Sequence, residues 1–371
     1  MPIAVIGCGA AGERHVSHLT ASAAAEVRWV CDTDREAAAR CGARHGVPRR
    51  ATDFREILAD KVVQAVVVAT PPASHRKLTV AAIRAGKSVL VEKPAAITLT
   101  DARAILEAAR ERPELLVMDC SARHSRLHAK YHHVRREIAS GGLGEVYCVH
   151  HRAVQRNARP GVEYQPGTRW FTRRSISGGG PLLDFGGYDL AFHLGVLGLR
   201  PPCVEAMIAL TRGGLDAVSR DRFTFDVEEH GVVMMRLRGG IVYYWERATN
   251  AHADAGDVSR IYGTDGGLRF SYPSWLPGRV ERFEPGVAEA HVIDLGSLAE
   301  QDAQEDHRRL VLHFVACLRG EERPVVPLEE AVENLAIVLA AYKRQGADRP
   351  VASPVPEGRG GGGLGPIRGV S

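Results

Sequence analysis

The sequence has few of the features that mark membrane, disulfide-rich or zinc-ribbon proteins. No apolar run approaches the roughly 20 residues that a membrane-spanning helix needs, and the first residues lack the basic flank of a signal peptide. The seven cysteines include no C-x-x-C pair, so neither a disulfide framework nor a zinc ribbon is indicated. We therefore expect a cytoplasmic protein without a metal ion or a membrane partner.

A strong excess of charge of one sign is also missing. The 48 Lys and Arg residues nearly balance the 44 Asp and Glu residues, which leaves a net charge of +4. Because nucleic-acid-binding proteins concentrate basic residues on one face, and the arginines here are scattered, we expect no nucleic-acid partner. Only six residues are lysine, so a lysine in a special place needs an explanation beyond composition. With 371 residues, 45% of them apolar, the chain is long enough for two globular domains.

The most informative motif is a glycine-rich turn near the start of the chain. A short apolar run, 2–6, leads into a G-x-G-x-x-G segment, and a second apolar run, 27–31, ends at an acid. Strand, glycine turn, helix, strand and acid in this order are typical of a dinucleotide-binding unit, whose turn and helix N-terminus bind the phosphates. The residues of this predicted cofactor site are Gly7, Gly9, Ala10, Ala11, Gly12 and Asp32.

The acid at the end of the second run bears on the choice of cofactor. The Asp32 carboxylate can accept hydrogen bonds from the ribose hydroxyls of adenosine and would repel a 2′-phosphate. The sequence therefore predicts NAD as the cofactor. NADP stays open as the alternative, because Arg14 or Arg35 could pair with the extra phosphate.

The alternation of strands and helices continues to about residue 118. Apolar runs at 62–69, 87–91 and 115–118 are separated by helical segments, which predicts a doubly wound parallel sheet, a Rossmann fold. Ligands of such sheets bind at the carboxyl ends of the strands. The loop residues that we add to the cofactor site are Thr70, Pro71, His75, Glu92 and Lys93.

A different pattern follows residue 122. Short apolar or alternating runs predict an open, largely antiparallel sheet from strands at 203–212, 222–227, 230–238, 240–248 and 258–263. We therefore predict three parts: a Rossmann domain over 1–122, an α+β substrate-binding and oligomerisation domain over 123–350, and a disordered Gly/Pro-rich tail over 351–371.

Within the second domain, the segment 178–194 (GGGPLLDFGGYDLAFHL) predicts a helix with chemistry on one face. Asp184 and Tyr188 are four residues apart and so share that face. Gly186 and Gly187 lie between them, and two glycines inside a helix cost about 2 kcal/mol relative to alanine. This cost suggests that a flat group, such as a nicotinamide or a sugar ring, approaches the helix closely.

Four segments, taken together and in order, resemble the Gfo/Idh/MocA family: GCGAAGERH, ATPPASH, AGKSVLVEKP and SGGGPLLDFGGYD. The resemblance implies an NAD(P)-dependent oxidoreductase that transfers a hydride between nicotinamide and a secondary alcohol or ketone carbon of a sugar, cyclitol or derivative. It also implies that the second domain pairs through its sheet in homodimers or homotetramers.

The resemblance assigns roles to particular residues. In the family, the lysine of Glu-Lys-Pro touches the substrate hydroxyl and the nicotinamide ribose, and the Lys–Pro peptide is often cis; here these residues are Lys93 and Pro94. The family's D-x-G-x-H segment usually supplies an Asp that holds the substrate and a His that exchanges the proton. Asp184 matches the first, and Tyr188 stands where the His would be, as it does in some members.

The resemblance thus implies that Lys93, Asp184 and Tyr188 are catalytic. A free tyrosine has a pKa of about 10, and we expect a nearby Lys93 to lower the pKa of Tyr188 so that it can exchange the proton. Lys93 itself or His193 is the alternative proton carrier. The residues that we expect to contact the substrate are Lys93, Arg123, Trp170, Asp184 and Tyr188.

Two other functions stay open on the sequence. A glycosidase of the same fold would use tightly held NAD to oxidise a sugar transiently and eliminate the glycosidic group. A non-catalytic NAD(P)-binding sensor would need no proton carrier, and the presence of both Lys93 and Asp184 argues against it.

Overall fold

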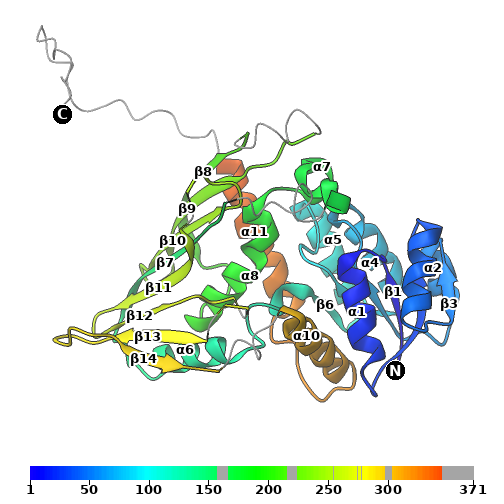
Figure 1. Ribbon diagram of the computed structural model, residues 1–371, viewed down its shortest axis with the longest axis horizontal. Helices are drawn as coiled ribbons and strands as arrows, with labels where there is room; N and C mark the ends of the chain where they lie inside the picture. Colours follow the sequence, from blue (N-terminus) through cyan, green and yellow to red (C-terminus); the bar gives the residue numbers. More distant parts are fainter. Residues whose placement is uncertain are drawn as a thin grey trace, which may run out of the picture.

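The structure, a computed structural model, describes most of the chain as two sheets with helices packed on them (Figure 1). The described residues are 1–156, 166–214, 224–253, 255–273, 275–276, 278–296 and 303–344. The tail predicted over 351–371 lies outside them. Among the described helices, none combines the length and the apolar character needed to cross a membrane.

The N-terminal sheet is parallel throughout and has the strand order β3-β2-β1-β4-β5-β6, which confirms the predicted Rossmann fold. Its strands are β1 (Pro2–Ile6), β2 (Glu26–Cys31), β3 (Arg49–Ala51), β4 (Ala65–Val68), β5 (Ser88–Val91) and β6 (Val117–Asp119). β3 escaped prediction because two of its three residues are arginines rather than apolar residues.

Helices cover both faces of this sheet, which explains why its strands are apolar on both sides. They are α1 (Ala10–Thr20), α2 (Arg35–Arg44), α3 (Phe54–Ala59), α4 (His75–Arg84) and α5 (Leu99–Arg110). Along β1, Ile3 and Val5 pack in one buried cluster with residues of α1 and α2, and Ala4 and Ile6 pack in another with residues of α4 and α5.

The C-terminal sheet is open and has eight strands in the order β14-β13-β12-β11-β7-β10-β9-β8. They are β7 (Val146–Val154), β8 (Val204–Arg212), β9 (His230–Leu237), β10 (Val242–Ala248), β11 (Gly256–Gly263), β12 (Gly267–Phe270), β13 (Arg279–Phe283) and β14 (His291–Asp294). β7 and β10 pair in parallel and the other pairs are antiparallel, as predicted in the main. The strand predicted over 222–227 is wrong for 224–227, which form no strand, while 222–223 lie outside the described residues.

The remaining helices join the two sheets. They are α6 (Ala129–Ala139), α7 (Arg174–Ser177), α8 (Pro181–Val196), α10 (Ala303–Leu318) and α11 (Leu328–Arg344). α10 returns to the N-terminal domain, where its Leu310 and Phe314 share a buried cluster with Val16 and Leu19 of α1. α8 and α11 lie between the two sheets, so residues of α8 can reach the carboxyl ends of the parallel strands (Figure 1).

Of the two glycines in the middle of α8, Gly186 has a packing explanation rather than the ligand contact we expected. A Cβ on Gly186 would lie 2.6 Å from the Val338 side chain of α11 and 3.0 Å from the Trp245 ring of β10. A Cβ on Gly187 would meet Ser121 at 3.7 Å, an ordinary contact. Gly186 therefore permits the close approach of α8 to α11 and to the sheet.

A buried ionic cluster fixes α8 on the C-terminal sheet. Asp189 of α8 is fully buried and accepts hydrogen bonds from Arg247 Nε at 2.7 Å, Arg247 Nη2 at 2.6 Å and Trp245 Nε1 at 2.7 Å. The Tyr272 hydroxyl also donates to it. Burial alone would raise the pKa of Asp189, but Arg247 and His151 hold it below its usual value, so the carboxylate stays charged.

Candidate functional site

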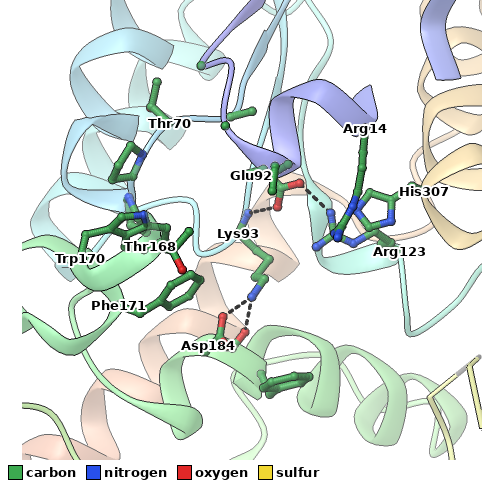
Figure 2. A pocket seen from close by; sticks show the side chains of 18 of the residues that line it. Arg14, Thr70, Glu92, Lys93, Arg123, Thr168, Trp170, Phe171, Asp184 and His307 are labelled. Carbon is green, nitrogen blue, oxygen red and sulfur yellow. Dashed lines mark hydrogen bonds and ion pairs between the residues drawn. The ribbon is translucent and has the colours of Figure 1, made fainter. Parts of the chain in front are cut away.

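A pocket of about 560 Å³ opens between the carboxyl ends of the parallel strands and α8 (Figure 2). Its walls come from both halves of the chain, which is where the sequence placed the candidate chemistry. The predicted residues that line it are Gly7, Gly9, Ala10, Ala11, Asp32, Thr70, Pro71, Glu92, Lys93, Arg123, Trp170, Asp184 and Tyr188.

The glycine turn at one end of the pocket leaves room for a ligand close to the backbone. Gly7 has a φ of +102°, and a Cβ there would lie 2.5 Å from the Ala69 carbonyl oxygen. A Cβ on Gly9 would meet nothing within 4 Å, so this side of the turn is open. Gly12 does not line the pocket: a Cβ there would lie 1.8 Å from the Gly7 carbonyl oxygen, so it serves the packing of α1 instead.

α1 begins at Ala10 directly after this turn, and its N-cap residue, Gly9, offers no side-chain cap. The first N–H groups of a helix have no intrahelical partner, and together with the helix dipole they form an anion site. The open turn and the uncapped helix N-terminus therefore fit the pyrophosphate of a dinucleotide.

Asp32 is held in place at the end of β2. Its Oδ2 accepts a hydrogen bond from the Cys8 N–H at 2.8 Å, and its Oδ1 accepts one from the Asp34 N–H at 3.0 Å. Each carboxylate oxygen keeps a further lone pair, and the side chain lines the pocket beside the glycine turn. This arrangement fits the vicinal hydroxyls of a ribose.

His75 corrects one predicted assignment, because it does not line the pocket. Its ring is fully buried, with Nδ1 2.8 Å from the Pro94 carbonyl oxygen and Nε2 2.6 Å from the Thr70 carbonyl oxygen. Burial lowers the pKa of His75. The side chain thus joins the loop after β4 to the loop after β5.

Lys93 and Asp184 meet in the pocket although they are far apart in the sequence. Lys93 follows β5, and its peptide bond to Pro94 is cis. Its ammonium group donates to the Asp184 backbone oxygen at 2.8 Å and to the Asp184 carboxylate (Figure 2). The Lys93 nitrogen also lies 5.2 Å from the centre of the Tyr188 ring. The ammonium, the carboxylate and the phenol ring therefore converge at one place.

The phenol of Tyr188 is hydrogen-bonded to Arg123 rather than to Lys93. Arg123 Nη2 donates to the Tyr188 hydroxyl, and Arg123 Nη1 donates to Glu92 Oε1 at 2.6 Å. Burial raises the pKa of Tyr188 well above its usual value, and Arg123 only partly opposes this. The expected lowering of this pKa by Lys93 is therefore wrong, because desolvation outweighs the nearby cation.

Glu92 is buried in the same cluster. His15 Nε2 lies 2.9 Å from its Oε1, which also receives Arg123. Burial would raise the pKa of Glu92, but Arg123 and His15 hold it well below its usual range, so Glu92 is a carboxylate. Although Glu92 lines the pocket, its carboxylate pairs with Arg123, which in turn donates to the Tyr188 hydroxyl.

His193, the alternative proton carrier, lies away from the pocket. It is fully buried, and its Nδ1 and Nε2 are 2.8 Å from the Asp189 carbonyl oxygen and 2.9 Å from the Ser259 hydroxyl. Burial lowers its pKa to about 3. This residue of α8 therefore belongs to the buried contacts between α8 and the C-terminal sheet, not to the pocket.

Several residues of the pocket were not singled out in the sequence as site residues. They are Thr33, Ala69, Thr168, Phe185, His124, Trp275 and His307. Arg14, the possible partner of a 2′-phosphate, also lines the pocket, as do Pro72 and Phe171. His124 packs edge-on against Tyr188, with ring centres 4.8 Å apart, and its Nδ1 lies 2.7 Å from Asp306 Oδ2. Trp170 and Phe171 stack with centres 3.8 Å apart. The sequence does not predict that Trp275 and His307 line the pocket, because long stretches of chain separate them from the other lining residues.

Comparison with known proteins matches both halves of the chain. The model of an oxidoreductase family with an NAD-binding Rossmann fold matches residues 1–119, and that of the GFO/IDH/MocA C-terminal domain matches residues 131–269. The 1,5-anhydro-D-fructose reductase of Ensifer adhaerens is 29% identical over 321 residues, which are 86% of this chain and 88% of the relative. The D-glucoside 3-dehydrogenase of Escherichia coli (strain K12) is 30% identical over 210 residues, 56% of either chain.

Solved structures share the fold over nearly the whole chain. Levoglucosan dehydrogenase in complex with NADH and levoglucosan has a TM-score of 0.76 at 21% identity, and the match covers 93% of this chain and 96% of that one. The myo-inositol 2-dehydrogenase of Lactobacillus plantarum has a TM-score of 0.74 at 20% identity, with the same coverage.

Proposed function

Since the chain belongs to the Gfo/Idh/MocA family of oxidoreductases, whose N-terminal domain is an NAD-binding Rossmann fold, we propose that it interconverts a secondary alcohol and a ketone on a sugar, a cyclitol or a derivative. The observation that carries this proposal is the meeting of Lys93, Asp184 and Tyr188 in the pocket beside the glycine turn. When bound, NAD supplies the hydride acceptor or donor.

The polar groups of the pocket suit a polyol. The Lys93 ammonium can donate to the substrate oxygen at the reacting carbon, while the Asp184 carboxylate can accept from a neighbouring hydroxyl. The stacked rings of Trp170 and Phe171 offer an apolar wall for the C–H face of a sugar ring. A ligand with several adjacent hydroxyls satisfies these groups better than a simple alcohol does.

We assign the proton to Tyr188. Its phenol is neutral at pH 7 because burial raises its pKa, so it can donate a proton to the oxygen of a ketone undergoing reduction. Arg123, itself held by Glu92, fixes the phenol oxygen and stabilises the phenolate that remains. In the opposite direction the phenolate accepts the proton of the alcohol.

The proposal is tested with a panel of sugars, cyclitols and their keto derivatives, incubated with the full chain and NAD or NADH. Oxidation or reduction that changes the absorbance of the cofactor supports it. Release of an aglycone from a glycoside without net change of the cofactor would support the glycosidase instead. Tight NADH binding without turnover of any panel member would contradict both enzymatic functions and favour the sensor.

The Asp32→Ala variant should lose preference for NAD over NADP. Removing the carboxylate removes two charge-assisted hydrogen bonds to ribose and the repulsion of a 2′-phosphate, so NAD affinity should fall about ten- to hundredfold while NADP affinity falls less. Fluorescence titration with both reduced cofactors measures the ratio.

Asp34→Ala is the matched control for this variant. Asp34 is a neighbouring acid that caps α2 by accepting from the Glu36 N–H at 2.9 Å, and it does not line the pocket. Its loss should cost some stability and leave the NAD/NADP ratio unchanged. An unchanged ratio in Asp32→Ala, or a wild type that already prefers NADP, would show that Asp32 does not select the cofactor.

We further propose that the outer face of the C-terminal sheet pairs with a second copy of the chain. Helices cover its inner face, and none of the described helices covers the outer one (Figure 1). Large apolar side chains are exposed there in register: Ile208 is 59% and Leu210 65% exposed, and Ile208 pairs with Met234, which is 48% exposed. An apolar sheet face of this kind is typical of an interface.

The Ile208→Lys/Leu210→Lys double variant should therefore dissociate the assembly. Multi-angle light scattering should give the wild type a mass of two or four chains and the variant a smaller one. Val62→Lys is the control, since Val62 is equally apolar and 50% exposed but lies in the N-terminal domain. A wild type with the mass of one chain would rule out this interface.

A further inference from the structure

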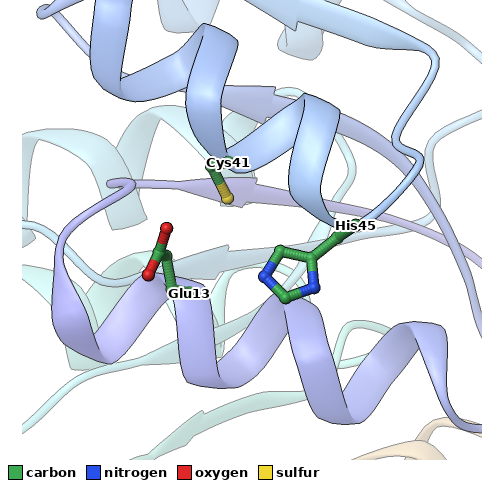
Figure 3. A group of neighbouring side chains, drawn as sticks. All are labelled: Glu13, Cys41 and His45. Atoms are coloured by element: carbon green, nitrogen blue, oxygen red, sulfur yellow. The ribbon is translucent and has the colours of Figure 1, made fainter.

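Away from the pocket, three side chains of the N-terminal domain point toward one another between α1 and α2 (Figure 3). Glu13 lies in the first turn of α1, Cys41 lies in the second half of α2, and His45 follows the last residue of α2. One carboxylate oxygen, the sulfur and one ring nitrogen all lie within 4.8 Å of one another. None of the three residues lines the pocket.

The local sequence explains how these groups come together. Cys41 and His45 are four residues apart, so they project from the same side of α2. Glu13 follows Gly12 directly, at the start of the helix that packs against α2 through a shared apolar cluster. The group therefore depends on two well-packed helices rather than on a loop.

The imidazole of His45 is short of a partner. Its Nε2 atom is buried and has no hydrogen-bond partner among the described residues, and Figure 3 shows the ring turned toward the carboxylate and the sulfur. A buried polar atom without a partner destabilises the folded state, because it has lost its hydrogen bonds to water and gained none in return. Such a nitrogen, aimed at a sulfur and a carboxylate, points to a ligand that is bound by all three.

We propose that Glu13, Cys41 and His45 bind a zinc ion. Thiolate, imidazole and carboxylate are the three donor types that zinc prefers, and a water molecule would complete a tetrahedron. The thiolate and the carboxylate together balance the charge of the ion. Arg44 donates to Glu13 Oε2 at 3.0 Å, which uses one carboxylate oxygen and orients the other.

The position of the ion indicates what it does. It joins the first turn of α1, next to the phosphate-binding glycine turn, to α2, which follows Asp32. Metal binding therefore stabilises the adenosine half of the cofactor site without contacting the substrate. Metal binding itself can be measured without the reaction proposed above, so the two proposals can fail separately.

A second cluster in the chain provides the control. His313, Cys317 and Glu322 also have ligand atoms within 4.8 Å of one another. However, the Val325 N–H donates to His313 Nε2 at 3.2 Å, and His313 Nδ1 pairs with Glu322. Both ring nitrogens are already satisfied, so this cluster should bind no metal.

The test uses the full chain, reduced and freed of metal with a chelator, and titrated with Co²⁺. One equivalent should bind and give a thiolate-to-cobalt charge-transfer band, and Zn²⁺ should displace it. Cys41→Ser should abolish the band, and His45→Gln should weaken cobalt binding by at least about tenfold. Cys317→Ser should keep both the band and the affinity.

Thermal unfolding gives a second measurement. Zinc should raise the melting temperature of the wild type and of Cys317→Ser, but not that of His45→Gln. If Cys41→Ser fails to fold because Cys41 is buried, His45→Gln and Glu13→Gln decide the question, since both residues are only half-buried. A wild type without the band, or a band lost with Cys317→Ser and kept with His45→Gln, would overturn the proposal.

Discussion

Replacing Tyr188 with phenylalanine should lower kcat by about 10²–10⁴-fold and leave cofactor binding close to that of the wild type. The change removes one oxygen, which Arg123 holds in the pocket beside Lys93. Without it, no phenol donates or accepts the proton of the reacting oxygen. Steady-state kinetics on the substrate found in the panel gives kcat, and fluorescence titration with NADH gives the affinity.

The pH dependence of the reaction tests the same residue. Burial raises the pKa of Tyr188 well above its usual value, so the phenol is protonated at neutral pH. Ketone reduction needs this proton and should proceed at neutral pH. Alcohol oxidation needs the deprotonated form, so its rate should rise as the pH rises toward that pKa. The phenylalanine variant should lose this rise.

Tyr131→Phe is the matched control for both measurements. Tyr131 is also buried and accepts a hydrogen bond from an arginine, Arg135 Nη1 at 3.3 Å, but it lies outside the pocket. Its loss should change neither kcat nor the pH profile. If Tyr188→Phe keeps a kcat near that of the wild type, the proton role of the phenol is wrong.

Replacing Asp189 with alanine should lower the free energy of unfolding by about 3–5 kcal/mol. The variant leaves the buried Arg247 guanidinium without the carboxylate to which two of its nitrogens donate, and within the described part of the chain only Asp257, whose Oδ2 lies 3.9 Å from Arg247 Nη2, remains nearby. The Trp245 N–H also loses its acceptor. Denaturant unfolding followed by fluorescence measures the loss.

Asp53→Ala shows what an exposed aspartate contributes. Asp53 caps α3 by accepting from the Arg55 N–H at 3.0 Å, and its ion pair with the Arg55 side chain is solvent-exposed. Its loss should cost only about 1 kcal/mol. If Asp189→Ala is no less stable than Asp53→Ala, the buried ionic cluster is not what holds α8 on the sheet.

The N-terminal half could be predicted from the sequence because its signals are local. The glycine turn, the apolar strands β1 and β2, and Asp32 all lie within one strand–helix–strand unit. Each of these segments adopts the conformation that its residue types favour. The one missed strand, β3, is short and carries arginines, so it lacks the apolar pattern on which such predictions depend.

The second half and the electrostatics of the pocket were harder to predict because they depend on long-range contacts. The spacing of Asp184 and Tyr188 placed both on one helix face, but it could not show that Arg123 would hold the phenol or that burial would raise its pKa. The two glycines of α8 suggest a ligand contact in the sequence, whereas Gly186 faces Val338, which lies far along the chain. The contacts of Arg123 with Tyr188 and of Gly186 with Val338 join residues far apart in the sequence, so no local pattern predicts them.

The position of β7 at the centre of the eight-stranded sheet has a consequence for how the protein is made. β7 lies between β10 and β11, both of which follow it by a long stretch of chain, whereas β8–β9–β10 and β11–β12–β13–β14 are sequential neighbours. Such non-local closure is slow. α8 leaves the ribosome before β10, whose Trp245 and Arg247 anchor it. The pocket wall formed by α8 is therefore anchored only once β10 has been made, and α1 gains its contacts with α10 later still.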